Sequence, residues 1–175
     1  MAAQVQFEEW VSFPVELVFR FFANPHNLAR IMPPATDTRI DRANIIEPPP
    51  PASASHSQSA NLGGVGTEIV TSFKVLPPLL LRATWTAVIT EFEWNHHFAD
   101  IQSKGPFRSW HHRHEFAAEI RRGVSGTLVR DVIEYEVGFG FLGTLAEKLF
   151  ISGQLRRTFA QRQQILGSLL SDPDL

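Results

Sequence analysis

The residues best suited to chemistry lie close together in the stretch 98–116, where polar and aromatic side chains alternate. A carboxylate, Asp100 or Asp131, can orient a histidine, which can then act as a general acid or base on a carbonyl-bearing substrate. Dehydration and aldol cyclisation are reactions of this kind. These residue types therefore allow proton-transfer chemistry, with His112 and Asp100 as the candidate catalytic pair.

The same residue types also bind metals. A His-x-His pair on a strand points both rings to one side, so His112 and His114 could bind a metal together with a carboxylate. No independent motif supplies a third histidine. We therefore expect no metal and no other cofactor.

A purely structural role competes with both chemical roles. Polar residues that face a core can satisfy one another in a buried, hydrogen-bonded network. We favour this interpretation over catalysis and expect the network to border a cavity. The polar side chains that would form the network are Asp100, Gln102, His112, His114, Asp131 and Tyr135.

Two strands joined by a turn must position these side chains. Read with a period of two, residues 98–102 and 110–116 each place their polar and aromatic side chains on one face, and Gly105-Pro106 marks the turn between them. Symmetric pairing about this turn predicts three cross-strand pairs, namely Asp100 opposite His112, Phe98 opposite His114, and Gln102 opposite Trp110.

The strand expected at 127–137 adds a second carboxylate. One of its faces carries Arg130, Glu134 and Glu136, so the opposite face should point to the core. Asp131 lies on that otherwise apolar face. We expect it beside the strand that carries the two histidines.

The remaining elements are expected in the order strand, two short helices, several strands and a long helix. Pro14 and the pair Asn24-Pro25 begin the two short helices, because proline suits the first turn of a helix. Residues 47–61 are rich in Pro, Ala and Ser and are expected to form a mobile loop, whereas residues 76–81 form an apolar loop. The other expected strands cover residues 4–11, 36–46, 67–75 and 82–94.

The long C-terminal helix is expected to begin at a capping box formed by Thr144 and Glu147. Leucine and phenylalanine residues recur along it at helical spacing, which predicts an apolar stripe that faces the sheet. The basic residues expected on its polar side are Lys148, Arg156, Arg157 and Arg162.

Length and composition indicate one domain with a substantial core, since the chain has 175 residues and is 43% hydrophobic. The net charge of -2 gives no general attraction to nucleic acid or to an anionic membrane. Cysteine is absent, which fits a reducing compartment. The sequence shows no signal peptide and no apolar run long enough to span a bilayer. We therefore expect a cytoplasmic protein without nucleic-acid binding or stable membrane insertion.

Residues 138–143 read G-x-G-x-x-G, the pattern of dinucleotide-binding loops. That pattern requires a further parallel strand with an acidic residue for the ribose, and the helix that follows is the last element we expect. A tight connection between strand and helix explains these glycines better than nicotinamide binding.

An antiparallel sheet with one apolar face needs a cover, and the last helix is large enough to provide it. We therefore expect an α+β, helix-grip fold, in which a curved antiparallel sheet wraps around the long C-terminal helix and two short helices follow the first strand. Four motifs match a known family: F-R-F-F-A-N-P-H-N-L at 19–28, F-x-D-x-Q-x-x-G-P-F-x-x-W-x-H-x-H-x-F at 98–116, D-x-I-x-Y at 131–135 and G-F-L-G at 140–143. With these motifs the chain resembles the START-like (SRPBCC) superfamily, specifically its bacterial polyketide cyclase/dehydrase and lipid-transport-like group.

The resemblance implies a single domain that binds a small, largely apolar molecule or lipid in a cavity between the sheet and the C-terminal helix. The alternative is a polyketide cyclase/dehydratase-like enzyme that uses the pair His112 and Asp100, and the sequence leaves open whether any reaction is catalysed. A third hypothesis is an interaction module whose loop at 76–81 docks on a partner or membrane. A monomer and a homodimer both stay open. The candidate ligand-binding residues are Trp85, Phe98, Asp100, Gln102, Trp110, His112, His114, Asp131 and Tyr135.

Overall fold

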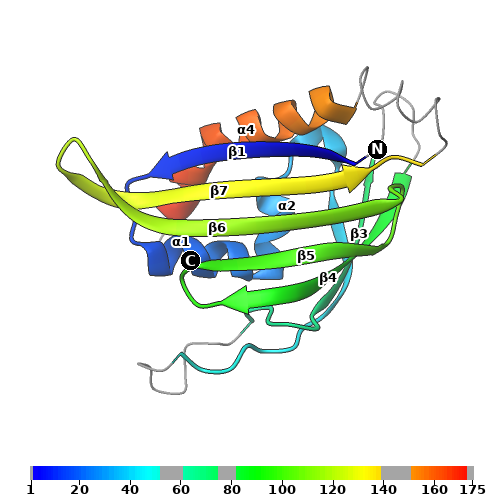
Figure 1. Ribbon diagram of the computed structural model, residues 1–175, viewed down its shortest axis with the longest axis horizontal. Helices are drawn as coiled ribbons and strands as arrows, with labels where there is room; N and C mark the ends of the chain where they lie inside the picture. Colours follow the sequence, from blue (N-terminus) through cyan, green and yellow to red (C-terminus); the bar gives the residue numbers. More distant parts are fainter. Residues whose placement is uncertain (1, 52–60, 75–81, 139–150, 173–175) are drawn as a thin grey trace.

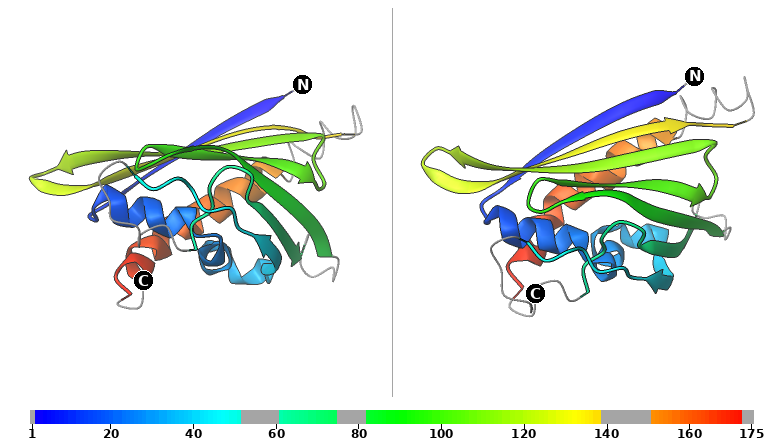
Figure 2. Two further views of the ribbon diagram at one scale, coloured as in Figure 1. Left: turned by 90° about the horizontal axis from the view of Figure 1, so that it is seen from below. Right: turned by 60° about the horizontal axis from the view of Figure 1, so that its bottom comes forward.

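The computed structural model of the protein describes residues 2–51, 61–74, 82–138 and 151–172. These residues form one antiparallel sheet of seven strands, with the helices packed on one of its faces (Figure 1, Figure 2). The order across the sheet is β1-β7-β6-β5-β4-β3-β2. The strands are β1 (Ala3–Val11), β2 (Arg39–Asn44), β3 (Glu68–Lys74), β4 (Arg82–Glu93), β5 (His97–Lys104), β6 (Ser109–Arg121) and β7 (Val124–Glu136).

A long C-terminal helix, α4 (Ser152–Leu170), runs beneath the curved sheet and contacts β1, α1 (Val15–Ala23) and α2 (Leu28–Ile31), as Figure 2 shows. Two 3₁₀ turns, Pro25–Asn27 and Pro34–Thr36, complete the segment between β1 and β2. This architecture confirms the expected α+β helix-grip fold. None of the helices in the described part of the chain is both long and apolar enough to cross a membrane.

The two short helices begin where the sequence predicts. The backbone N–H of Leu17 donates to the carbonyl of Pro14 at 3.1 Å, which starts α1 directly after the proline. The side chain of Asn24 accepts a hydrogen bond from the backbone N–H of His26 at 3.0 Å and caps the next turn. Phe19 is completely buried, so α1 is fixed to the sheet by its apolar face.

The β5–β6 hairpin has the predicted register at its centre. Asp100 pairs with His112, and Phe98 pairs with His114. Because side chains on opposite residues of an antiparallel pair share a face, the backbone alone brings these polar and aromatic groups together.

The predicted pairing of Gln102 with Trp110 does not form. The register of β5 and β6 ends at the pair Ile101 and His111. The side-chain amide of Gln102 instead donates to the carbonyl of Phe107 at 2.8 Å and accepts from the backbone N–H of Phe107 at 3.2 Å. Gln102 therefore stabilises the turn, because its side chain forms hydrogen bonds with backbone groups of Phe107 that lie beyond the paired part of the two strands.

On β7, alternate residues from 127 to 135 are buried, which confirms that this face points to the core. Asp131 lies opposite His114 on β6 and opposite Phe7 on β1. The second carboxylate therefore sits beside the histidine strand, as expected.

The core consists of two apolar clusters on this face of the sheet. On β6, the two histidines lie between Trp110 of one cluster and Phe116 of the other. On β7, Asp131 lies between Ile133 and Val129, which again belong to different clusters. The polar side chains therefore occupy the boundary between the two clusters.

Several expectations fall outside the described residues: the capping box at 144–147, the loop at 76–81, the glycine pattern beyond residue 138, and residues 52–60 of the Pro/Ser-rich segment. The first residues of the Pro/Ser-rich segment, 47–51, are described and contact the rest of the protein. Pro48 is buried, and Trp94 Nε1 donates to the carbonyl of Pro49 at 2.7 Å.

Candidate functional site

A fully buried carboxylate, that of Asp131, lies at the centre of the face that the helices cover. His112 Nε2 donates a hydrogen bond to Asp131 Oδ1 over 3.0 Å. His114 Nδ1 lies 2.7 Å from the same oxygen, in a close polar contact whose angle does not make a hydrogen bond. From α4, Arg162 Nη2 donates to the other oxygen, Oδ2. Strands β6 and β7 and helix α4 are thus joined through one carboxylate.

A second carboxylate faces the same two rings from β5. Asp100 Oδ2 lies 3.9 Å from His112 Nδ1 and 3.9 Å from His114 Nε2. Each ring therefore has one nitrogen toward Asp131 and the other toward Asp100. Within the described ranges, Asp100, His112 and His114 are the group whose potential ligand atoms lie near enough to hold a metal ion, all within 4.8 Å of one another.

Burial and neighbouring charges set the protonation of this centre. Burial alone would raise the pKa of Asp131, but the guanidinium of Arg162 and the two histidines bring that pKa well below its usual range. Burial lowers the pKa of His112, and His114 lowers it further. Burial raises the pKa of Asp100. At neutral pH the centre therefore holds an ionised Asp131 and a neutral His112, the states in which His112 donates and Asp131 accepts.

The expectation that Arg162 lies on the polar side of the C-terminal helix is wrong. Its side chain is only 5% exposed, and its guanidinium lies 4.5 Å from the centre of the Phe159 ring. Arg162 follows Phe159 by three residues and precedes Leu166 by four, so it shares the buried stripe of α4. That spacing was the signal in the sequence that could have placed it.

Glu9 on β1 completes the network and was also missed. Its Oε2 lies 3.6 Å from Arg162 Nε, and burial raises the pKa of Glu9 to about 7. The alternation of Phe7, Glu9 and Val11 on β1 places all three on the inner face. A carboxylate on an apolar strand face was the same signal that identified Asp131.

Aromatic rings surround the two histidines. Phe98 stacks on the ring of His114 with centroids 4.4 Å apart, and Phe159 of α4 meets the ring of His112 edge-on at 6.0 Å. The candidate Phe98 is thus in contact with the polar centre. The rings of His112 and His114 themselves lie 3.9 Å apart.

The other candidates form an aromatic group next to this centre. Trp85 of β4 contacts Trp110 edge-on at 4.8 Å, and Trp110 lies 5.9 Å from Tyr135 and 6.1 Å from His112. Gln102 lies at the turn, where its side chain is hydrogen-bonded to the backbone of Phe107. The ring of Phe107 in turn contacts that of Trp85, with centroids 5.6 Å apart. Trp85 and Phe107 are only half buried. Eight of the nine predicted residues are thus in contact through the polar centre and the aromatic group, and Gln102 reaches them only through Phe107.

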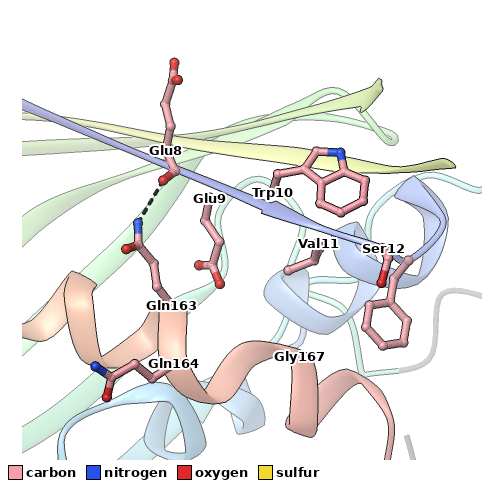
Figure 3. A pocket seen from close by; sticks show the side chains of 9 residues that line it. Glu8, Glu9, Trp10, Val11, Ser12, Gln163, Gln164 and Gly167 are labelled. Carbon is pink, nitrogen blue, oxygen red and sulfur yellow. Dashed lines mark hydrogen bonds between the residues drawn. The ribbon is translucent and has the colours of Figure 1, made fainter. Parts of the chain in front are cut away.

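A pocket of about 490 Å³ opens between β1 and α4, at the edge of the sheet (Figure 3). The side chain of Glu9 points toward Gln163 and Gln164 on α4, and Gln163 Nε2 donates to the backbone carbonyl of Glu8 at 2.8 Å. None of the predicted site residues lines this pocket, but Glu9 connects it to the network around Asp131. The residues that line it are Glu8, Glu9, Trp10, Val11, Ser12, Phe13, Gln163, Gln164 and Gly167.

Comparison with known proteins yields matches among solved structures, whereas no family model and no curated protein matches the chain. Zhui aromatase/cyclase from Streptomyces sp. R1128 aligns with a TM-score of 0.67 at 13% identity, over 98% of this chain and 94% of that one. The chain has the START-like helix-grip fold.

Two further structures share this helix-grip fold. A START superfamily protein from Mycobacterium smegmatis has a TM-score of 0.58 at 13% identity, over 96% of this chain and 97% of its own. Norcoclaurine synthase from Thalictrum flavum has a TM-score of 0.58 at 14% identity, over 95% of this chain and 87% of its own. At such low identity the likeness concerns the fold, and the activity has to be argued from the site.

Proposed function

We propose that the protein binds a small, largely apolar molecule or lipid between its sheet and α4. The observation that carries this proposal is a buried ionic network set directly beside half-buried aromatic side chains. Burying charges is expensive, and a network of this kind adds little stability over apolar side chains of similar volume. A few polar groups in an otherwise apolar site are, in contrast, the usual means of orienting a small ligand.

The aromatic group would contact the body of the ligand, and the polar centre would contact its polar end. Trp85 and Phe107 offer apolar area, because both are half buried. Asp100 is 17% exposed, and no group of the described chain donates a hydrogen bond to it. Its carboxylate can therefore accept from a hydroxyl or N–H group of a ligand.

The test uses 8-anilinonaphthalene-1-sulfonate as a fluorescent probe, displaced by a medium-chain fatty acid. Trp85→Ala removes a large part of the aromatic surface and should weaken binding of the probe by about tenfold or more. Ile120→Ala is the matched control, because Ile120 is 71% exposed in the distant hairpin β6–β7 and should leave binding unchanged. Equal binding by wild type and Trp85→Ala would contradict the proposal.

A second candidate function is catalysis by His112 and Asp100, as in a cyclase or dehydratase. The observation that favours it is the pair of opposite shifts, since burial raises the pKa of Asp100 and lowers that of His112. An aromatase/cyclase is among the proteins that share the fold. The chemistry would be proton transfer at His112 Nδ1, the ring nitrogen that faces Asp100.

Two substitutions separate catalysis from a structural network once a bound compound has been recovered from the protein. Catalysis predicts that His112→Ala and Asp100→Asn each abolish turnover of that compound, a loss of about a hundredfold or more, with little loss of stability. A structural network predicts that His112→Ala lowers the free energy of unfolding, because Asp131 then loses a hydrogen-bond donor. Unchanged turnover in Asp100→Asn would exclude the catalytic role of that residue.

A further inference from the structure

Three potential metal ligands converge on one point between β5 and β6. Asp100 Oδ2 lies 3.9 Å from His112 Nδ1 and 3.9 Å from His114 Nε2, and all three atoms lie within 4.8 Å of one another. A carboxylate oxygen and the free nitrogen of a neutral imidazole are all acceptors. Among the described residues no hydrogen bond joins the Asp100 carboxyl group to either ring, so a cation between the three atoms would displace none.

The far side of both rings faces one carboxylate, and His112 is hydrogen-bonded to it. Metal-bound histidines usually direct their second ring nitrogen at a carboxylate, which fixes the ring and its tautomer. Here Asp131 Oδ1 lies 3.0 Å from His112 Nε2 and 2.7 Å from His114 Nδ1. Arg162 holds Asp131 Oδ2, so the orienting carboxylate is itself fixed.

The rigidity and charge of the site also suit a divalent cation. Asp100 and His112 are directly paired residues of two long strands, and His114 follows two residues later on the same face. The carboxyl groups of Asp100 and Asp131 outnumber the single guanidinium of Arg162 in this centre. A divalent cation bound at Asp100 would be the largest local charge in the centre and would favour the ionised form of that carboxyl group.

We propose that Asp100, His112 and His114 bind a divalent transition metal, for which Zn²⁺ is the best candidate, and that Asp131 orients the two imidazoles. Two imidazoles and one carboxylate are typical zinc ligands, and three protein ligands leave a fourth position for water or a bound molecule. Ligand atoms of a tetrahedral zinc site lie about 3.4 Å apart. The two separations from Asp100, 3.9 Å each, therefore require a contraction of about 0.5 Å, and the separation of the two ring nitrogens, which is within 4.8 Å, requires one of up to about 1.4 Å. The site goes beyond the proposed ligand binding and does not depend on it.

The test measures Zn²⁺ binding to tag-free, EDTA-treated protein by isothermal titration calorimetry. Wild type should bind one Zn²⁺ per chain, and Asp100→Asn should weaken that binding by about tenfold or more. His97→Ala is the matched control, because His97 contacts Glu91 and Glu93 instead of the site and should bind as wild type does. Absence of a one-to-one site in wild type, or a loss in His97→Ala as large as in Asp100→Asn, would overturn the proposal.

A second measurement uses the wild-type protein, so its result does not depend on whether a variant folds. Co²⁺ bound to wild type at the proposed site should give the intense visible absorption of a tetrahedral complex, and Zn²⁺ should displace it. The weak absorption of hydrated, octahedral Co²⁺ would overturn the proposal. Trp85→Ala should retain the metal site, because Trp85 is not a ligand, so failure of metal binding and failure of apolar-ligand binding are distinguishable.

Discussion

Replacing Arg162 by leucine should lower the free energy of unfolding by about 3–5 kcal/mol. Arg162 is 5% exposed and Asp131 is 0% exposed, and the guanidinium donates directly to the carboxylate. The substitution removes the cation and leaves the carboxylate of Asp131 buried with only its histidine contacts. A loss of this size reflects the unpaired charge, and it exceeds what an exposed ion pair contributes, about 0–1 kcal/mol.

Urea denaturation at pH 7 is the assay. With a slope of about 2 kcal/mol per M, a loss of 3–5 kcal/mol moves the midpoint down by about 1.5–2.5 M. Arg157→Leu is the matched control, since Arg157 is exposed on the same helix and its replacement should change stability by no more than about 0.5 kcal/mol. The double variant Arg162→Leu with Asp131→Asn should be more stable than Arg162→Leu alone, because the fully buried charge of Asp131 is then also removed.

If Arg162→Leu cost no more than Arg157→Leu, the buried ion pair would not hold α4 to the sheet. If the double variant were as unstable as the single one, the loss would come from packing and not from the unpaired carboxylate. Either result would refute the account of the network around Asp131.

Three further predictions concern Glu9, Gly126 and Gly167. Burial raises the pKa of Glu9 from 4.5 to about 7, so the folded protein loses stability as the pH rises across that range. Glu9→Gln should abolish this loss. The variant and wild type should have equal urea midpoints at pH 4, and at pH 8 the variant should have the higher free energy of unfolding, by up to about 3 kcal/mol and less after solvent screening. Equal midpoints of the two proteins at both pH values would contradict this prediction. Gly126→Ala should destabilise by about 1–3 kcal/mol, because a Cβ would lie 2.4 Å from both the Trp10 ring and the carbonyl of Val11. Gly167→Ala, with open space at its Cβ, should instead raise the thermal midpoint by an amount worth about 0.5–1 kcal/mol, and a lower midpoint would show hidden crowding.

The central hairpin could be predicted from the sequence because its strands have a strict period of two and a turn marked by Gly105-Pro106. The pairs of Asp100 with His112 and of Phe98 with His114 followed from that symmetry and were confirmed. The prediction was wrong at Gln102, where a side-chain amide satisfies backbone groups of the turn. Periodicity specifies a face, but it does not tell whether a polar side chain extends from the strand or folds back on its own turn.

The ionic network could be predicted only in part. Asp131 was found because its nearest neighbours on that face, Val129 and Ile133, are apolar, and the same reasoning applied to Glu9 would have found a second carboxylate. Arg162 was assigned to the polar side of its helix, since long basic residues are usually exposed there. Only the tertiary contact shows that the carboxylate on β7 and the arginine on α4 compensate each other, because neither segment alone contains the partner.

The binding of a small, largely apolar molecule between sheet and α4 is tested most directly by native mass spectrometry of the purified protein, followed by denaturing extraction. We predict a second species heavier than the bare chain by the mass of one small compound, which extraction recovers and which Trp85→Ala retains at a lower occupancy. A single species with the mass of the bare chain, unchanged after incubation with fatty acids and aromatic polyketide-like compounds, would contradict the proposed function.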